Sequence, residues 1–254
     1  MEALTDASDP LSPEPSALSP STPPFEQRVV ALLEVLICSD YPTQLAVGAT
    51  FTALGYAPFV HGELRIGYVV GVSLADAILL VGLILLFLYA HHESPVEVFT
   101  GRRRLGPEIA AGIPMTLVAL GIGIVVLTAV ERFAPGLHTV PENPLQAILK
   151  TRRNAALFAV VVIVAGGVRE EIQRAFLLHR FERWLGGRTV GVVVTSVAFG
   201  AGHLLQGIDA AIATGLLGAF WAVVYLRRRS IVAPMISHAG FDLVQIVQFL
   251  VVGR

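Results

Sequence analysis

The stretch IGYVVGVSLADAILLVGLILLFLYA occupies residues 66–90 and contains a single charged residue, Asp76. A helix needs about 20 consecutive apolar residues to cross the hydrocarbon core of a bilayer, so this stretch is long enough to span it. The alternation of apolar and polar residues that is typical of the strands of a membrane barrel is absent. The stretch therefore predicts a transmembrane helix. Similar segments at 109–130, 208–226 and 231–252 indicate that it is one of several.

The composition agrees with a protein that lies mostly in lipid. Of the 254 residues, 54% are hydrophobic and 15% are charged, and the mean hydropathy is +0.71. A soluble domain carries about 25% charged residues. We therefore predict an all-α fold, a polytopic transmembrane helical bundle. The net charge of −1 argues against nucleic acid as a partner, because phosphate binding needs a concentrated basic surface. The single cysteine, Cys38, excludes an internal disulfide.

Two parts of the chain differ in composition. Residues 1–26 are rich in proline, serine and acidic residues and lack the features of a secretory signal, so we expect a disordered cytoplasmic tail. Residues 27–254 form the predicted transmembrane domain. Its first apolar segment is interrupted by Asp40, and we expect it to cross once with a kink. We predict about seven spanning helices, within a range of six to eight: 28–60, 66–90, 109–130, 155 into the charged stretch after 167, 189–205, 208–226 and 231–252.

Arginine clusters follow alternate apolar segments. The loops at 102–104, 180–188 and 227–229 each hold three arginines. Basic loops stay on the cytoplasmic side of a membrane, which places these loops and the amino terminus in the cytoplasm. The loop 131–154 also holds basic residues, but it includes two glutamates, and the other three loops outweigh it. We expect a multi-pass protein of the plasma (inner) membrane.

Three carboxy-terminal segments carry ionisable residues that a lipid-facing helix would not tolerate. They are Glu170 and Glu171 in the fourth segment, His203 in the fifth, and His238 and Asp242 in the seventh. Phe199 precedes His203 by four residues and His238 precedes Asp242 by four, so each pair shares a helix face. An ionisable side chain at mid-bilayer costs about 2.5 to 3.5 kcal/mol, so these groups must face one another or water. We expect a polar cavity inside an apolar bundle.

Each of these motifs also has a structural explanation. The Glu170-Glu171 pair fits a solvated helix end that pairs with Arg169 and Arg174. His203 alone fits a core histidine bonded to a carbonyl, and the pair in the seventh segment fits a clasp between two helices. Taken together, three such motifs on three segments favour a functional site.

Four other residues do not indicate chemistry. Asp40 and Asp76 lie in apolar segments without a matching histidine nearby, so we expect structural or interfacial roles for them. Trp221 and Tyr225 suit the membrane interface, where aromatic residues with a polar tip are enriched.

With these three motifs, the sequence resembles the CPBP (Abi) intramembrane proteases, a family that comprises CAAX prenyl endopeptidases and bacteriocin-processing or immunity proteins. The family pattern is a paired Glu followed by Arg, then Phe-x-x-x-His, then His-x-x-x-Asn or Asp, each on a different helix. Glu170-Glu171, Phe199 to His203 and His238 to Asp242 match it in order, and the context 230–238 is similar to the last motif. The resemblance covers a protease-like core at about 155–254.

One position departs from the family pattern. The family usually places its arginine five residues after the first glutamate, whereas here Arg174 is four after Glu170 and Ala175 holds the expected site. An i, i+4 pair of glutamate and arginine is good helical geometry, so we expect Arg174 to form an ion pair with Glu170 from a rotated position. We assign substrate binding or ion pairing to Arg174 and Phe199.

Peptide hydrolysis needs an activated water and a group that stabilises the oxyanion. A glutamate in an apolar cavity can accept a proton from water near neutral pH, so Glu170 is assigned as the general base. The resemblance implies the same role and implies that His203 holds the water. His238 and Asp242 would steady the oxyanion or the water from the opposite helix, and Glu171 would support them.

The same residue types also suit a divalent metal such as zinc. Glu170, His203 and His238 are the candidate ligands, and the family has been described both as metalloproteases and as metal-independent glutamate proteases. The His-Glu-x-x-His motif of helical zinc proteases is missing. The sequence leaves both mechanisms open.

The resemblance implies an intramembrane endopeptidase whose partners are membrane lipids and a membrane-associated peptide or protein substrate, prenylated or not. Two other functions compete with it. A bacteriocin-immunity or scaffold-like protein would keep the fold without turnover. A proton-coupled transporter would also bury Glu, His and Asp, but transporters often show an internal repeat, and the sequence shows none.

Overall fold

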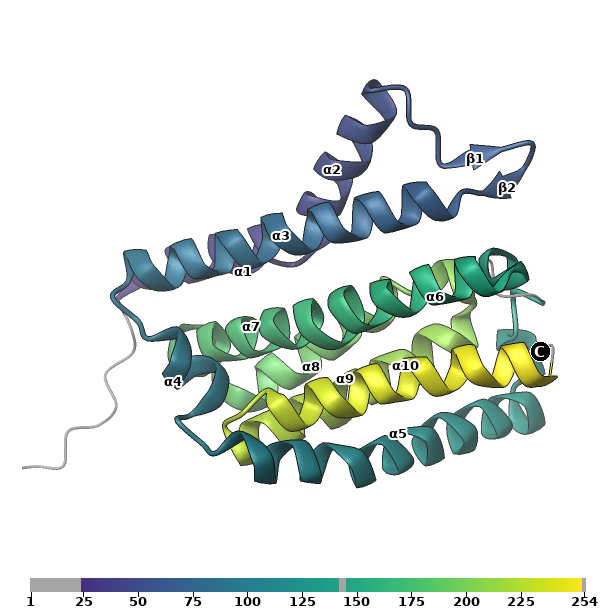
Figure 1. Cartoon of the computed structure of the whole chain (residues 1–254). Helices are drawn as coiled ribbons and strands as arrows, with labels where there is room; N and C mark the ends of the chain where they lie inside the picture. Colours follow the sequence, from purple (N-terminus) through teal and green to yellow (C-terminus); the bar gives the residue numbers. More distant parts are fainter. Residues whose placement is uncertain (1–23, 142–144, 253–254) are drawn as a thin grey trace, which may run out of the picture.

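The computed structural model describes residues 24–141 and 145–252, and most of them lie in the helices of one bundle (Figure 1). Of the predicted tail, residues 1–23 lie outside the described part of the chain, and the first helix already begins at Phe25. A short hairpin pairs β1 (Phe59–Val60) with β2 (Glu63–Leu64). The predicted fold class, an all-α helical bundle, is confirmed.

The helices follow the predicted apolar segments closely. Their bounds are α1 Phe25–Ile37, α2 Tyr41–Ala53, α3 Ile66–Ala90, α4 Pro95–Thr100, α5 Leu105–Phe133, α6 Arg152–Val161, α7 Glu171–Trp184, α8 Gly187–Ala201, α9 Ile208–Arg228 and α10 Val232–Val252. The segment Val162–Glu170 between α6 and α7 is a π-helix, so residues 152–184 form one continuous helical rod.

Four of the described helices, α3, α5, α9 and α10, are long and apolar enough to cross a bilayer. Helices α1 and α2, bent by 41° at the break that contains Asp40, qualify together as a fifth span. About seven spans were predicted, and the difference lies in the fourth and fifth segments. The rod 152–184 carries many charged side chains in its second half, and α8 is apolar but only 15 residues long.

Helix α10 lies among the other carboxy-terminal helices, packed along α5 and against the π-helical segment, while α8 packs along α9 (Figure 1). The largest apolar core joins α3 to α7, and its best-buried members are Leu80, Ile84, Leu88, Phe176 and Leu178. The outward faces of the long helices are also apolar, with Ile78 and Leu117 more than two-thirds exposed. An exterior of this kind suits lipid as the solvent.

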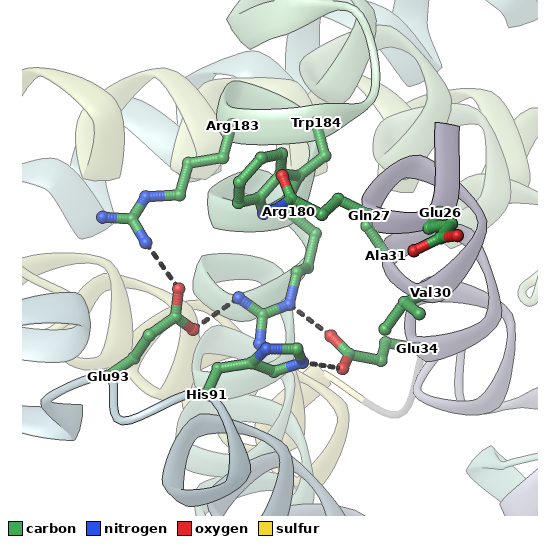
Figure 2. Close-up of a pocket in the computed structure, with 10 residues that line it drawn as sticks. All are labelled: Glu26, Gln27, Val30, Ala31, Glu34, His91, Glu93, Arg180, Arg183 and Trp184. Carbon is green, nitrogen blue, oxygen red and sulfur yellow. Dashed lines mark hydrogen bonds and ion pairs between the residues drawn. The ribbon is translucent and has the colours of Figure 1, made fainter. Parts of the chain in front are cut away.

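A cluster of charged side chains, here called the Arg180 cluster, joins α7 to the amino-terminal helices (Figure 2). The guanidinium of Arg180 is buried, and it donates to Glu34 of α1 and to Glu93 after α3, each at 2.5 Å. His91 lies 2.6 Å from the other oxygen of Glu34, and Arg183 donates to Glu93 at 2.6 Å. The cluster therefore ties α1 and the end of α3 to the rod 152–184.

Replacing Arg180 by methionine would leave the buried carboxylate of Glu34 and the partly buried one of Glu93 without their shared cation. We expect the free energy of unfolding to fall by about 3 to 5 kcal/mol, as measured by unfolding of the purified protein in detergent. The matched control is Arg183→Met, because that side chain is 52% exposed. It should cost less than about 1 kcal/mol. Equal stabilities of the two variants would contradict the importance of the cluster.

Glu93 also predicts how stability depends on pH. Burial raises the pKa of its carboxyl, but hydrogen bonds from His179 and Arg180 outweigh burial and lower the pKa to about 2. An unfolded glutamate titrates at about 4.3, so the stabilising effect of Glu93 is complete above that pH and is lost as the pH falls further. We expect the melting temperature to fall more steeply between about pH 5 and pH 3 in the wild type than in Glu93→Gln. Parallel curves would show that Glu93 makes no such contribution.

Candidate active site

The candidate site begins where the π-helical segment meets α10. Gly166 and Gly167 face α10 without side chains, and a Cβ on Gly167 would lie 2.7 Å from the Cβ of Ala239. A Cβ on Gly166 would lie 2.8 Å from the carboxylate of Asp242. The two glycines therefore let the helices approach closely. A π-helical turn inside a longer helix is often found at a functional site, because it changes the direction of the side chains that follow.

Glu171, directly after the π-helix, is 1% exposed and has two partners. Its Oε1 accepts hydrogen bonds from Nδ1 of His238, at 2.9 Å, and from the guanidinium of Arg174. The predicted pairing of Arg174 with Glu170 was wrong, because regular α-helical geometry starts at Glu171 and the arginine three residues on reaches that side chain. The solvated helix end considered from the sequence is also excluded, since Arg169, Glu171 and Arg174 are buried.

Glu170 points to a different side and is less deeply buried than its neighbour. One carboxylate oxygen lies 3.7 Å from Nε2 of His238, and the other lies 3.7 Å from the guanidinium of Arg169. Asp242, one turn after His238, places Oδ2 3.8 Å from the same Nε2. Within the described part of the chain, no side chain forms a hydrogen bond to the Glu170 carboxylate. Its oxygens are therefore available to a water or a substrate.

His203 lies just past the end of α8, and its Nδ1 donates a hydrogen bond to the carbonyl of Phe199 at 2.9 Å. A bond of this kind agrees with the structural interpretation of His203, a core histidine bonded to a carbonyl. In the neutral ring it leaves Nε2 as an acceptor. The ring of Phe199 lies 5.0 Å from the ring of His203 and 6.0 Å from that of His238, so it separates the two imidazoles. The guanidinium of Arg174 lies over the ring of Phe199, 4.7 Å from its centre.

Trp221 was expected at the membrane interface, and this prediction was wrong. The side chain is 1% exposed and stacks on the imidazole of His238, with ring centres 3.9 Å apart and an angle of 18° between the planes. Its Nε1 donates to Ser237 at 3.1 Å. Tyr225 is also buried, and its hydroxyl donates to the carbonyl of Val98. Trp221 lies on the face of α9 that meets α10, so packing between helices decides its position.

Three residues given no role in chemistry, Asp40, Asp76 and Arg169, come together behind Glu170. Nη1 of Arg169 lies 2.5 Å from Asp40, and its Nε lies 3.8 Å from Asp76. The available signal was Asp76 itself, a lone carboxylate in an otherwise uncharged span, because such a group needs a cationic partner. The sequence does not tell which of the arginines that partner is.

The candidate site residues face a cavity of about 750 Å³. Glu170, His203, His238 and Asp242 line it, together with Phe199 and Trp221. Most of its remaining wall is apolar, and examples are Leu127, Leu149, Phe158, Val161 and Phe249. Apolar walls with a few convergent polar groups are typical of a ligand or active site. The expected polar cavity inside the bundle is present.

The candidate metal ligands do not form a metal site. In the part of the chain that the structure describes, no three His, Cys, Asp or Glu side chains are arranged to hold a metal ion. Nδ1 of His238 is engaged by Glu171 and Nδ1 of His203 by a carbonyl, which leaves Nε2 of each ring as the nitrogen that could bind a metal. The arrangement of the side chains, and not their hydrogen bonds, is what does not fit: Glu170, His203 and His238 are not placed as ligands of one zinc ion.

Comparison with known proteins bears on the carboxy-terminal part of the chain. Residues 152–244 match the family model described as "Type II CAAX prenyl endopeptidase Rce1-like". The matched region contains the three motifs and ends two residues after Asp242, and helices α1 to α5 lie outside it. No curated protein and no solved structure matches the chain. The part of the chain that carries the three motifs is thus similar to the type II CAAX prenyl endopeptidases, in agreement with the resemblance that the motifs indicated.

Proposed function

We propose that the protein is an intramembrane endopeptidase of the CAAX type in which Glu170 activates a water molecule. The observation that carries the proposal is the meeting of Glu170, His238 and Asp242 in one cavity with apolar walls. The Glu170 carboxylate has Arg169 on one side and His238 on the other, each at 3.7 Å, and retains free lone pairs. A general base needs this combination, since it must be held in place and still accept a proton.

The reaction follows from these positions. Glu170 removes a proton from the water, and the water oxygen bonds to the carbonyl carbon of the substrate. His203, with Nε2 as an acceptor, holds the second hydrogen of that water. The carbonyl oxygen becomes an oxyanion, which Nε2 of His238 stabilises when it carries a proton. The C–N bond then breaks, and Glu170 returns its proton to the departing amine.

The remaining residues position this machinery. Glu171 and Trp221 fix the imidazole of His238, the first through a hydrogen bond to Nδ1 and the second by stacking. Asp242 orients Nε2 from one turn further along α10. Phe199 forms part of the cavity wall against which the substrate rests, and the buried guanidinium of Arg174 supports its ring. Since most of the remaining cavity wall is apolar, the substrate in this proposal is a membrane-associated peptide, and prenylated CAAX peptides are the first to test.

The proposal includes the orientation expected from the arginine-bearing loops. The amino terminus and the loops at 102–104, 180–188 and 227–229 lie in the cytoplasm, and the protein is in the plasma (inner) membrane. Support comes from the places of these arginines in the structure. They lie after α4, near the end of α7, at the start of α8 and at the end of α9, all at the same end of the bundle, while the turns after α5 and α8 lie at the other end (Figure 1).

Replacing Glu170 by glutamine removes the proton acceptor and preserves the size of the side chain. We expect the rate of cleavage of a membrane-bound peptide to fall by at least about 100-fold, with little change in melting temperature. The control is Glu97→Gln, an exposed glutamate of α4, which should cleave at the wild-type rate. Cleavage retained by Glu170→Gln would remove this residue from the role of base and favour a non-catalytic relative of the family.

The arrangement of the candidate metal ligands also predicts how the cleavage rate responds to chelators. Because the described His and Glu side chains do not form a metal site, dialysis against a strong zinc chelator should leave the cleavage rate within about twofold of the starting value. Full loss of activity on dialysis, with recovery on adding zinc, would show a metalloprotease instead.

A further inference from the structure

We propose that Arg169 is a positioning residue for Glu170 and that the amino-terminal helices complete the active site through Asp40 and Asp76. The inference rests on the proposed role of Glu170 as the base. Two of these residues, Asp40 and Asp76, precede residue 152 and so lie outside the family match. Arg169 adjoins Glu170 in the π-helical segment.

Three nitrogens of the Arg169 guanidinium face three different carboxylates. Nη1 lies 2.5 Å from Asp40, Nε lies 3.8 Å from Asp76, and Nη2 lies 3.7 Å from Glu170. The side chain of Arg169 is 6% exposed, and that of Asp76 is 1% exposed. Neither Nε nor Nη1 has a hydrogen-bond partner among the described residues, so the contacts with the two aspartates are ion pairs. Turning the buried guanidinium away from Asp40 and Asp76 would separate opposite charges inside the protein, which is costly. The two aspartates therefore favour the direction in which Nη2 meets Glu170.

Charge explains why this arrangement is stable inside an apolar bundle. Asp40 lies in the break between α1 and α2, and Asp76 lies in the middle of α3. Among the described residues, the cation within ion-pair distance of both is Arg169. A buried carboxylate without such a partner would be costly. The same cation serves Glu170, so the base is coupled to two helices that otherwise lie behind the site.

The position of Asp40 is itself well defined. Its backbone has a φ of 78°, in the left-handed region that is uncommon for residues other than glycine, asparagine and aspartate. Its carboxylate accepts a hydrogen bond from Gln44 at 2.6 Å, and the hydroxyl of the next residue, Tyr41, donates to the carbonyl of Ala198 in α8. These two hydrogen bonds fix the break between α1 and α2, and with it the position of the Asp40 carboxylate that the guanidinium meets.

A purely structural role is the alternative. In that case Arg169 would only neutralise the two aspartates, and any cation in its place would keep the base working once the protein folds. The two roles differ in what they do to turnover, because misplacing a catalytic group by about 1 Å can cost on the order of 100-fold in rate without weakening substrate binding.

The test measures kcat and KM separately, with the full-length protein in lipid vesicles and one membrane-bound peptide that the wild type cleaves. Arg169→Lys keeps the charge but loses the three-sided geometry, so we expect kcat to fall by about tenfold or more while KM changes by less than about threefold. Arg102→Lys is the matched control, since this arginine is exposed and pairs only with Glu97 among the described residues. It should leave both constants unchanged.

A second variant tests whether the effect passes through the aspartates. Asp40→Asn tolerates the same backbone conformation and removes the charge. We expect it to lower kcat by about threefold to tenfold on its own and to add little in the Arg169→Lys background, because both changes act on one guanidinium. Independent effects that multiply would overturn the proposal.

The outcomes separate this inference from the function on which it rests. If Glu170→Gln still cleaves, the proposed base is wrong. If Glu170→Gln is inactive but Arg169→Lys turns over at the wild-type rate, the base stands and the positioning role is overturned. If Arg169→Lys fails to fold, as its melting curve would show, Asp40→Asn decides alone, and a wild-type kcat in that variant overturns the inference.

Discussion

An ionised side chain inside a bilayer must find its partner within the protein, because lipid supplies neither water nor counter-ions. Much of the architecture follows from this constraint. The rod 152–184 supplies one member of several buried pairs: Arg169 meets Asp40 before α2 and Asp76 in α3, Glu171 meets α10, and Arg180 meets α1. The charged rod therefore acts as the common support to which the apolar spans are attached. Its own hydropathy is low, since its neighbours and not lipid surround the charged face.

Adjacent carboxylates on this rod have different surroundings, and the difference assigns their tasks. Glu171 is fully enclosed and has hydrogen-bond donors from two directions, so its contribution is to hold His238 and Arg174. Glu170 has neighbours at a longer distance and an open side toward the cavity. Consecutive residues on a helix point about 100° apart, and this angle is enough to place one glutamate in the scaffold and the other in the solvent of the site.

Sequence reasoning succeeded where a pattern depends on local chemistry. Long apolar runs predicted the helices, and the high cost of isolated charges predicted that Glu170, His203, His238 and Asp242 would face one cavity, which all four line. It failed where the outcome depends on packing between distant segments. The π-helix that redirects Arg174 to Glu171 has no local signature beyond two glycines, and Trp221 could be placed only by knowing which face of α9 meets α10. Asp40 and Asp76 were visible as unusual residues, but their common partner lies about 90 to 130 positions further along the chain.

The stacking of Trp221 on His238 has a practical consequence. The chain contains two tryptophans, and the other, Trp184, lies at the far end of α7 in the Arg180 cluster pocket. An indole in van der Waals contact with an imidazole of the site is a built-in optical probe, whose emission responds to the charge and the neighbours of that ring. With Trp184 changed to phenylalanine, the arrival of a peptide in the cavity could be followed by fluorescence in real time, without attaching a dye to either molecule.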